Sequence, residues 1–255
     1  MKVVSCYKLV PDVDTIKVNS DRTLDPGAAD WEVGQYDLIG VEVATRLVEA
    51  NEGSTLTALT AGGSITENSK LRKSILARGP QELKIVQDDA IASADCYAVS
   101  SALAAAIKKI GDVDIVVFGE GSGDTYAQQT GSMVGAMLGW NTVNAVNKAE
   151  IVDGKLVVSR AIEECNETLE IALPAVISVS SDSCVPRLAS MRDILQAGKK
   201  PVEVWSLGDV GASAESKVEV VSILAPEQTD RMKIVAGADN EEHINAVVQQ
   251  MRSFM

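Results

Sequence analysis

The sequence is poor in aromatic residues and in histidine, and its cysteines form no paired motif. Aromatic side chains make up 4% of the 255 residues, and the one histidine is His243. The hydrophobic core must therefore consist mainly of Val, Ile, Leu and Ala. None of the four cysteines stands in a Cys-x-x-Cys pair. This argues against a thiolate metal site and favours reduced, buried thiols.

The scarcity of histidine also bears on catalysis. Ser-His-Asp and Cys-His enzymes use a histidine as the base that activates the nucleophile. His243 follows two glutamates on a polar C-terminal stretch, where we expect a solvated surface helix. The sequence therefore offers no usual base for either kind of nucleophilic catalysis.

Positive charge and long apolar runs are scarce as well. Lys and Arg number 23 against 36 Asp and Glu, which gives a net charge of −13. Binding to a nucleic-acid backbone needs a positive surface, so this class of function is disfavoured. No run of 18 apolar residues occurs, and Met1 leads directly into a predicted strand. We therefore expect no membrane span, no signal peptide and a cytoplasmic location.

The first part of the chain alternates strand-like and helix-like segments. Apolar strand patterns cover residues 3–7, 55–60, 83–86 and 113–118. The helices that follow them are expected from Asp37, over residues 67–77 and 94–110, and from Thr125 to about Leu138. This alternation predicts a Rossmann-like α/β fold, in which a mostly parallel sheet carries helices on both faces.

The pattern changes after Trp140. Strand-like segments flank Asp153-Gly154, a dipeptide typical of hairpin turns, and predict antiparallel strands that extend the sheet. We expect the main α/β domain to cover residues 1–205. Residues 206–255 hold too little apolar sequence for a core of their own, although residues 218–224 are strand-like and residues 241–252 helical. We interpret them as an arm that docks on another chain, with docking on the main domain as the alternative.

A glycine-rich loop follows the fourth predicted strand. Gly119, Gly121 and Gly123 allow the backbone to approach a ligand closely. Thr125 and Gln128 have the spacing of a capping box, so we expect the next helix to begin there with free amides directed at the loop. Such a helix start suits a phosphate or another anion. An ordinary βα turn without a ligand remains the alternative for this loop taken alone.

Two further segments are predicted to meet this loop. Lys8 follows the first strand, and Ala61-Gly62-Gly63-Ser64 follows the second. The carboxyl ends of parallel strands lie on one edge of the sheet, where open α/β sheets bind their ligands. This convergence favours a ligand site over an ordinary turn.

Motifs spread over the chain resemble those of one family. They are Cys6-Tyr7-Lys8-Leu9-Val10-Pro11-Asp12, Tyr36-Asp37 with Glu42, Gly119 with Asp124 and Gln129-Thr130-Gly131, residues 158–164, Glu167-Thr168-Leu169, Leu173-Pro174-Ala175-Val176, Pro186-Arg187 and Ala197-Gly198-Lys199-Lys200-Pro201. In this order they resemble electron transfer flavoprotein β-subunits. The resemblance looks closest to the bacterial branch associated with carnitine and fatty-acid oxidation gene clusters.

The resemblance implies a heterodimer in which an α-subunit holds most of the FAD and this chain holds AMP. The phosphate of AMP would lie at the amides of Gln128, Gln129 and Thr130. Tyr36 matches an aromatic residue that approaches the flavin, and Val13 stands where some relatives have a tyrosine. The cofactor-binding residues implied by the resemblance are Cys6, Gly34, Gln35, Tyr36, Asp37, Ala61, Gly119, Glu120, Gly121, Ser122, Gly123, Asp124, Thr125, Tyr126, Ala127, Gln128, Gln129 and Thr130.

The resemblance also implies electron carriage with no catalytic side chain in this chain. A flavin dehydrogenase of the acyl-CoA type would reduce the FAD, and a quinone oxidoreductase or another acceptor would oxidise it. Residues 187–197, the recognition segment, would dock the dehydrogenase, and Met191 suits an adaptable apolar contact. The docking residues are Arg187, Leu188, Met191 and Ile194. Arg160 and Glu163-Glu164 are candidates for contacts with the α-subunit, or else form a solvated strand edge.

Alternatives remain for the bound nucleotide. Electron-bifurcating relatives carry a second FAD in the AMP position, with an Asp-Gly-Asp-Thr-Ala-Gln run in this loop. Here bulky Tyr126 replaces an acidic residue of that run, which favours AMP. A third possibility is that Tyr126 partly fills the site. An adenine-nucleotide enzyme or sensor is a more distant alternative, because the loop after Ala61 lacks the serine and aspartate of ATP pyrophosphatases.

Overall fold

The computed structural model describes residues 1–25, 27, 29–227 and 240–253. Contacts divide these residues into two units: Met1–Lys17 with Asp25–Ser222, and Val18–Leu24 with the described residues from Ile223 onward. The predicted arm therefore begins within the first unit, and its residues 228–239 and 254–255 lie outside the described part of the chain.

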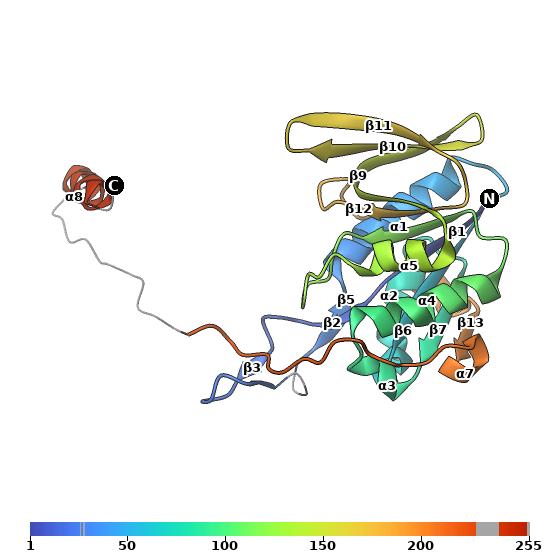
Figure 1. The fold of residues 1–255 in the computed structure, drawn as a ribbon, viewed down its shortest axis with the longest axis horizontal. Coiled ribbons are helices and arrows are strands. Elements are labelled where there is room, and N and C mark those ends of the chain that lie inside the picture. The colour runs from blue at the N-terminus through green and yellow to red at the C-terminus, as the bar shows by residue number, and fades with distance from the viewer. Residues whose placement is uncertain (26, 28, 228–239, 254–255) are drawn as a thin grey trace. The chain divides into compact units, whose positions relative to one another are not determined.

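The first unit is built on a nine-stranded sheet (Figure 1). The strand order is β11-β10-β9-β12-β8-β1-β6-β7-β13. Among these strands β10 runs antiparallel to both neighbours, whereas the strands from β9 to β13 in this order pair in parallel. The bounds are β1 Lys2–Cys6, β6 Thr55–Gly62, β7 Glu82–Gln87, β8 Ile115–Gly119, β9 Asn141–Val152, β10 Lys155–Ile162, β11 Cys165–Ile171, β12 Ala175–Val179 and β13 Val202–Trp205.

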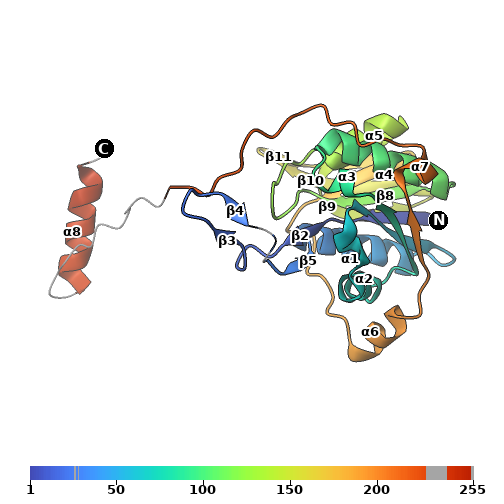
Figure 2. The same cartoon turned by 90° about the horizontal axis from the view of Figure 1, so that it is seen from below.

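Helices cover both faces of this sheet (Figure 2). Helices α4, α5 and α7 lie on one face, and α1, α2 and α6 lie on the other. The bounds are α1 Gln35–Glu49, α2 Ser69–Leu76, α3 Asp89–Ala92, α4 Cys96–Ile110, α5 Thr130–Leu138, α6 Met191–Ala197 and α7 Leu207–Val210, with a 3-10 turn over Ser64–Glu67. Short strands pair as β2 Leu9–Pro11 with β5 Trp31–Val33, and β3 Lys17–Val18 with β4 Leu24–Asp25.

Alternation along the central strands creates a core on each face. Val4 of β1 packs in the core below α4 and α5, whereas its neighbour Val3 packs against α1. Because successive side chains of a strand point to opposite faces, a strand covered on both sides must be apolar throughout. The continuous run Ile115 to Phe118 meets this need, and all four of its side chains are buried. The predicted Rossmann-like α/β class is confirmed.

The antiparallel extension is also confirmed. Asp153 and Gly154 join β9 to β10, and both have positive φ, at 49° and 76°. These angles suit the two-residue turns whose twist matches that of the flanking strands. The hairpin β9–β10 and the edge strand β11 therefore extend the sheet beyond β12.

Two predicted helix starts are wrong. The helix after the glycine-rich loop begins at Thr130, not at Thr125, because Tyr126 and Gln128 have φ of 45° and 56°. This left-handed geometry cannot continue a right-handed helix. Helix α1 begins after Gly34, and Asp37 lies inside its first turn rather than at the N-cap position.

The C-terminal region departs from prediction in one segment. Residues 218–224 form no strand; within them the structure has a single bridge, from Leu224 to Thr23. Helix α8, Asn240–Arg252, agrees with the predicted helix. Its exposed apolar side chains recur with helical spacing and form one stripe. They are Ile244, Val247, Val248 and Met251.

Asp95 ties residues 217–218, near the end of the first unit, to the start of α4. Its carboxylate caps α4 by accepting the Ala98 amide at 2.9 Å. The same carboxylate accepts the amides of Lys217 at 2.6 Å and Val218 at 2.8 Å. These hydrogen bonds hold the pKa of Asp95 below its ordinary value. One side chain thus fixes both the helix start and the chain that passes over it.

Asp95→Ala is expected to release this part of the chain. The lost cap should lower the free energy of unfolding by about 1 kcal/mol, and freed backbone near Lys217 should become a protease site. Limited proteolysis followed by mass spectrometry locates the cleavage. Asp88→Ala is the matched control, because Asp88 caps α3 without contacting the C-terminal region. If cleavage near Lys217 is as weak in Asp95→Ala as in Asp88→Ala, the packing of Ala212 and Ala214 holds the segment instead.

Candidate functional site

The strand order defines a topological switch point beside β1. The chain leaves β1 for β6 and β7 on one side, then returns to β8 on the other side. Connections that diverge in this way open a crevice at the carboxyl ends of the two strands, where α/β sheets bind ligands. The loops after β1 and β8 are therefore the walls of the candidate site.

The predicted cofactor-binding residues gather at this edge. Cys6 ends β1, Gly119 ends β8, and Ala61 lies near the end of β6. Gly34, Gln35, Tyr36 and Asp37 form the start of α1. The loop over residues 120–129 follows β8, and Thr130 opens α5. Cys6 is buried, and burial raises the pKa of its thiol.

Two contacts cross the crevice from one wall to the other. The Lys8 ammonium lies 2.6 Å from a carboxylate oxygen of Asp124. The rings of Tyr36 and Tyr126 lie 5.2 Å apart between centroids and are tilted by 48°, a geometry that aromatic pairs favour. The loop after β8 is thus held to the start of α1 and to the end of β1.

The backbone of Gly119 approaches α1 too closely for any side chain. A Cβ placed there would lie 2.6 Å from the carbonyl carbon of Tyr36 and 2.8 Å from a carboxylate oxygen of Asp37. Helix α1 has a matching glycine, because a Cβ on Gly40 would lie 3.2 Å from the Gly119 nitrogen. These two glycines let the walls of the crevice touch through their backbones.

Asp37 is buried where the walls meet. Its carboxylate accepts the Lys8 amide at 2.7 Å and also the amide of Gly119. Burial raises the pKa of Asp37 to about 7, against the two amides and Lys8, which lower it, while Asp124 adds to the rise. A buried carboxyl that titrates near neutrality is a feature of functional sites as well as of structural networks.

The amides at the start of α5 fit a phosphate. Gln129 is the N-cap residue, and no side chain caps the helix. Within the described part of the chain, the amides of Gln128, Gln129 and Thr130 find no acceptor. Unpaired donors at the positive end of a nine-residue helix suit an anion. The donor set is therefore compatible with a nucleotide phosphate, although the helix start lies five residues after Thr125.

The recognition segment lies apart from the crevice, on the face of the sheet that carries α2 (Figure 2). Leu188 and Met191 are 91% and 75% exposed, and Ile194 is 38% exposed. Arg187 differs from these residues because its guanidinium is engaged by Glu42 and Glu49 of α1. The three apolar residues expected to dock a partner are thus exposed, whereas the guanidinium of Arg187 is engaged within the chain.

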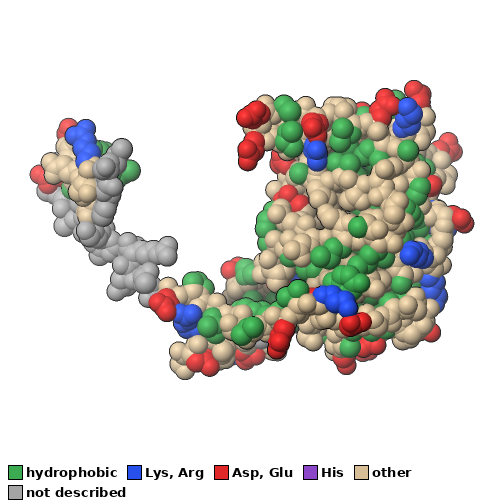
Figure 3. Space-filling model, in the orientation of Figure 1, with side chains coloured by type: hydrophobic (Ala, Val, Ile, Leu, Met, Phe, Trp, Pro, Cys, Tyr) green, Lys and Arg blue, Asp and Glu red, His purple; other side chains and the backbone are tan. Residues whose placement is uncertain are grey.

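Acidic side chains gather at the free end of the β10–β11 hairpin (Figure 3). Glu163 and Glu164 form its exposed turn. Arg160 pairs across the strands with Glu167 at 2.7 Å. Of the three residues expected at a subunit contact, the two glutamates are therefore exposed, and the arginine is engaged within the hairpin.

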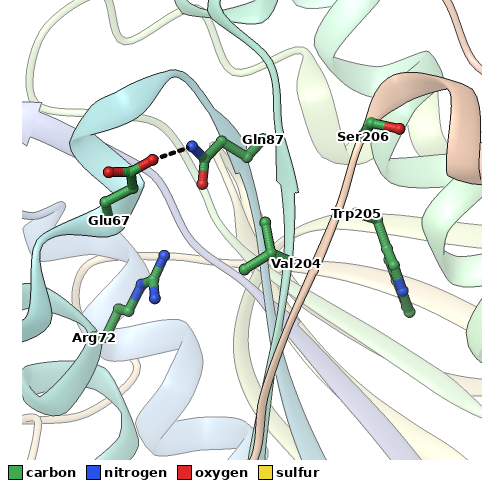
Figure 4. A pocket seen from close by; sticks show the side chains of 6 residues that line it. All are labelled: Glu67, Arg72, Gln87, Val204, Trp205 and Ser206. Atoms are coloured by element: carbon green, nitrogen blue, oxygen red, sulfur yellow. Dashed lines mark hydrogen bonds between the residues drawn. The ribbon is translucent and has the colours of Figure 1, made fainter.

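A separate pocket lies at the carboxyl ends of β7 and β13 (Figure 4). Its lining residues are Glu67, Arg72, Gln87, Val204, Trp205 and Ser206. The amide of Gln87 donates to Glu67 at 2.6 Å, and the Arg72 Nε donates to the Thr66 carbonyl at 2.6 Å. None of the predicted cofactor-binding residues lines this pocket, so it is distinct from the crevice at the switch point.

The described residues also define two limits. They contain no cluster of three or more His, Cys, Asp or Glu side chains that could hold a metal ion. Among the helices that the structure describes, none has the length and apolar character needed to cross a membrane.

The strand order defines a Rossmann-like α/β protein whose switch point lies beside β1, the place where such sheets bind ligands. The family model described as electron transfer flavoprotein domain matches residues 23–210 of this chain. The match covers well over half of the 255 residues, so the chain belongs to the electron transfer flavoprotein family. Members of this family are flavin-associated electron carriers rather than enzymes in the usual sense.

Sequence reasoning missed several residues that shape the site. Lys8 was expected at the carboxyl edge of the sheet but not as the partner of Asp124. No role was predicted for Gly40. Glu42 belonged to a family motif, yet its pairing with Arg187 could not be foreseen. A charged residue directly after a buried strand was the one available signal for Lys8.

Proposed function

We propose that this chain is the β-subunit of a heterodimeric electron transfer flavoprotein. It would carry electrons from a flavin dehydrogenase of the acyl-CoA type to a quinone oxidoreductase or another acceptor. The single observation that carries the proposal is the family match over residues 23–210, a range that includes most of the strands around the switch point. FAD, held mostly by the α-subunit, supplies the one- and two-electron chemistry. The residues of this chain would bind and orient the cofactors and shield them from solvent.

AMP is the nucleotide that the crevice supports best. The free amides at the start of α5 suit its phosphate. The Tyr126 ring lies directly over Gly121, where a Cβ would be 2.4 Å from it, and it also packs on Tyr36. A bulky ring at this place leaves less room for the additional groups of a second FAD. The larger cofactor of bifurcating relatives is therefore the less favoured occupant.

Two apolar surfaces fit the proposed partners. The stripe on α8 suits the α-subunit, because an amphipathic helix buries its apolar face on a partner. We therefore narrow the proposed docking arm to the chain after Ser222, since the preceding residues belong to the first unit. The recognition segment suits the dehydrogenase, because exposed methionine and leucine side chains adapt to an apolar partner surface.

The test is co-expression of the chain with the α-subunit encoded beside it, compared with the chain alone. We expect a one-to-one complex that contains one FAD and one AMP, measured by flavin absorbance and by chromatography of the released nucleotides. About two flavins per complex would contradict AMP and support the second-FAD alternative. A chain that carries no flavin and forms no complex with its neighbour would contradict the β-subunit assignment.

A further inference from the structure

The recognition segment exposes apolar side chains between two fixed points. Leu188 is 91% exposed, Met191 75% and Leu195 72%. On either side of them the chain is anchored, first at Arg187 on α1 and then at Ala197 on α2, where Ala197 is buried. A short apolar segment that is held at both ends has few conformations available. It therefore offers a partner a preorganised surface, which lowers the entropic cost of binding.

The first anchor is an arginine fork shared by two glutamates. Arg187 Nε donates to Glu42 at 2.7 Å, and its backbone amide donates to the same carboxylate at 3.2 Å. Its two terminal nitrogens reach Glu49 at 2.6 and 2.9 Å. The second of these nitrogens also lies 3.3 Å from Glu42. Every nitrogen of the guanidinium is engaged, so this side chain acts within the subunit.

The buried carboxylate makes this anchor strong. The Glu42 side chain is 5% exposed. Burial raises the pKa of Glu42, but hydrogen bonds from Arg187 and Arg46 outweigh it and leave the pKa below its ordinary value. Removing one partner of such a pair leaves a buried charge with less compensation, which proteins tolerate poorly. Lysine cannot replace the planar fork that contacts both carboxylates.

The second anchor consists of helix α6 and the residues that directly follow it. Ser190 and Asp193 form a reciprocal capping box at the start of α6. After α6, the Lys200 ammonium donates at 2.6 Å to the carbonyl of Leu76, the last residue of α2, and at 2.7 Å to the carbonyl of Pro80. The exposed side chains between Arg187 and Ala197 are therefore carried by a chain whose two ends are fixed on different helices.

We propose that Glu42, Arg187 and Glu49 form a clamp that positions the recognition segment for docking of the dehydrogenase. In this role Arg187 is a positioning residue that does not contact the partner. The inference rests on the proposed function, since it concerns the partner surface of the same electron carrier. The clamp fixes the orientation of Leu188 and Met191 before the partner arrives, and this lowers the ordering cost of docking.

The first measurement uses hydrogen exchange on the purified heterodimer and needs no dehydrogenase. Arg187→Lys is expected to speed amide exchange in residues 188–196 about tenfold, with the sheet unaffected. Arg46→Met is the matched control, because Arg46 binds the same carboxylate at 2.7 Å without holding the segment. Glu42→Gln combined with Arg187→Met removes the charge pair, so the test remains valid if Arg187→Lys folds poorly. Unchanged exchange in both Arg187 variants would overturn the clamp.

The second measurement follows electron transfer from a purified acyl-CoA dehydrogenase to the heterodimer. Arg187→Lys should raise the KM for the dehydrogenase about tenfold with little change in kcat, because docking and not chemistry is affected. Met191→Ala, at a proposed contact, should raise the same KM. The inference fails if the wild-type protein transfers electrons and Met191→Ala raises the KM, but Arg187→Lys keeps the wild-type KM. If the wild-type protein accepts no electrons from the dehydrogenase, the proposed function itself fails.

Discussion

Gly119→Ala is expected to abolish nucleotide retention in the crevice. The added Cβ would lie 2.6 and 2.7 Å from the carbonyl carbon and oxygen of Tyr36 and 2.8 Å from the Asp37 carboxylate. These neighbours are backbone and a buried, hydrogen-bonded carboxylate, so they cannot rotate away. Relief requires the two walls to separate, at a cost of about 1–3 kcal/mol by analogy with overpacked cores. The measurement is the nucleotide released by heat from the purified protein, which should fall below about a tenth of wild type.

The same loop provides the control. A Cβ on Gly123 meets nothing within 4 Å, so Gly123→Ala should keep its nucleotide and its thermal stability. Comparing the two variants distinguishes a lost contact between the loop and α1 from a general loss of backbone flexibility at glycine. Full retention of nucleotide by Gly119→Ala would show that the wall contact does not control the site.

The architecture could be predicted because its signals are local. The run from Ile115 to Phe118 is apolar at every position, and a strand covered on both faces requires this. Asp153-Gly154 defined its hairpin because few dipeptides accept two positive φ angles in succession. Such elements predict parallel strands whose carboxyl ends share one edge of the sheet, and with it the edge of the candidate site, whereas the strand order is known only from the structure.

The details of the site could not be predicted because they depend on pairs that are distant in sequence. Lys8 and Asp124 are separated by 116 positions, and Glu42 and Arg187 by 145. The periodicity of one segment carries no information on such partners. Local rules also failed inside the loop, where Tyr126 has a left-handed backbone that bulky residues seldom adopt. The capping-box spacing of Thr125 and Gln128 was therefore misleading.

Both misjudged helix starts lie at the edge of the sheet that holds the candidate site. Asp37 was expected to cap α1, yet its carboxylate turns to the amides of Lys8 and Gly119. The loop after β8 likewise leaves its own helix uncapped. In both places groups that would complete a helix in isolation are used to join the walls or left available to a ligand. Departures from local rules are expected at functional sites.

Asp37 is expected to make stability depend on pH near neutrality. Burial raises its pKa to about 7 from an ordinary value of 3.8. Between these values the folded protein keeps a proton that the unfolded chain has released, so the free energy of unfolding falls as the pH rises. The contribution is complete below the unfolded pKa and is lost once the pH passes the folded pKa. Between pH 5 and pH 8 the fall should be about 3 kcal/mol.

Urea unfolding at pH 5, 6, 7 and 8 measures this slope, and Asp37→Asn should remove it because an amide does not titrate. Both proteins should also carry His243→Gln, so that the comparison concerns Asp37 alone. A slope that survives in Asp37→Asn would assign the titration to another group. A flat wild-type profile would mean that the amides of Lys8 and Gly119 keep the carboxylate ionised despite its burial. Asp37 would then join the walls as a permanent anion, and the contact between them would be independent of pH.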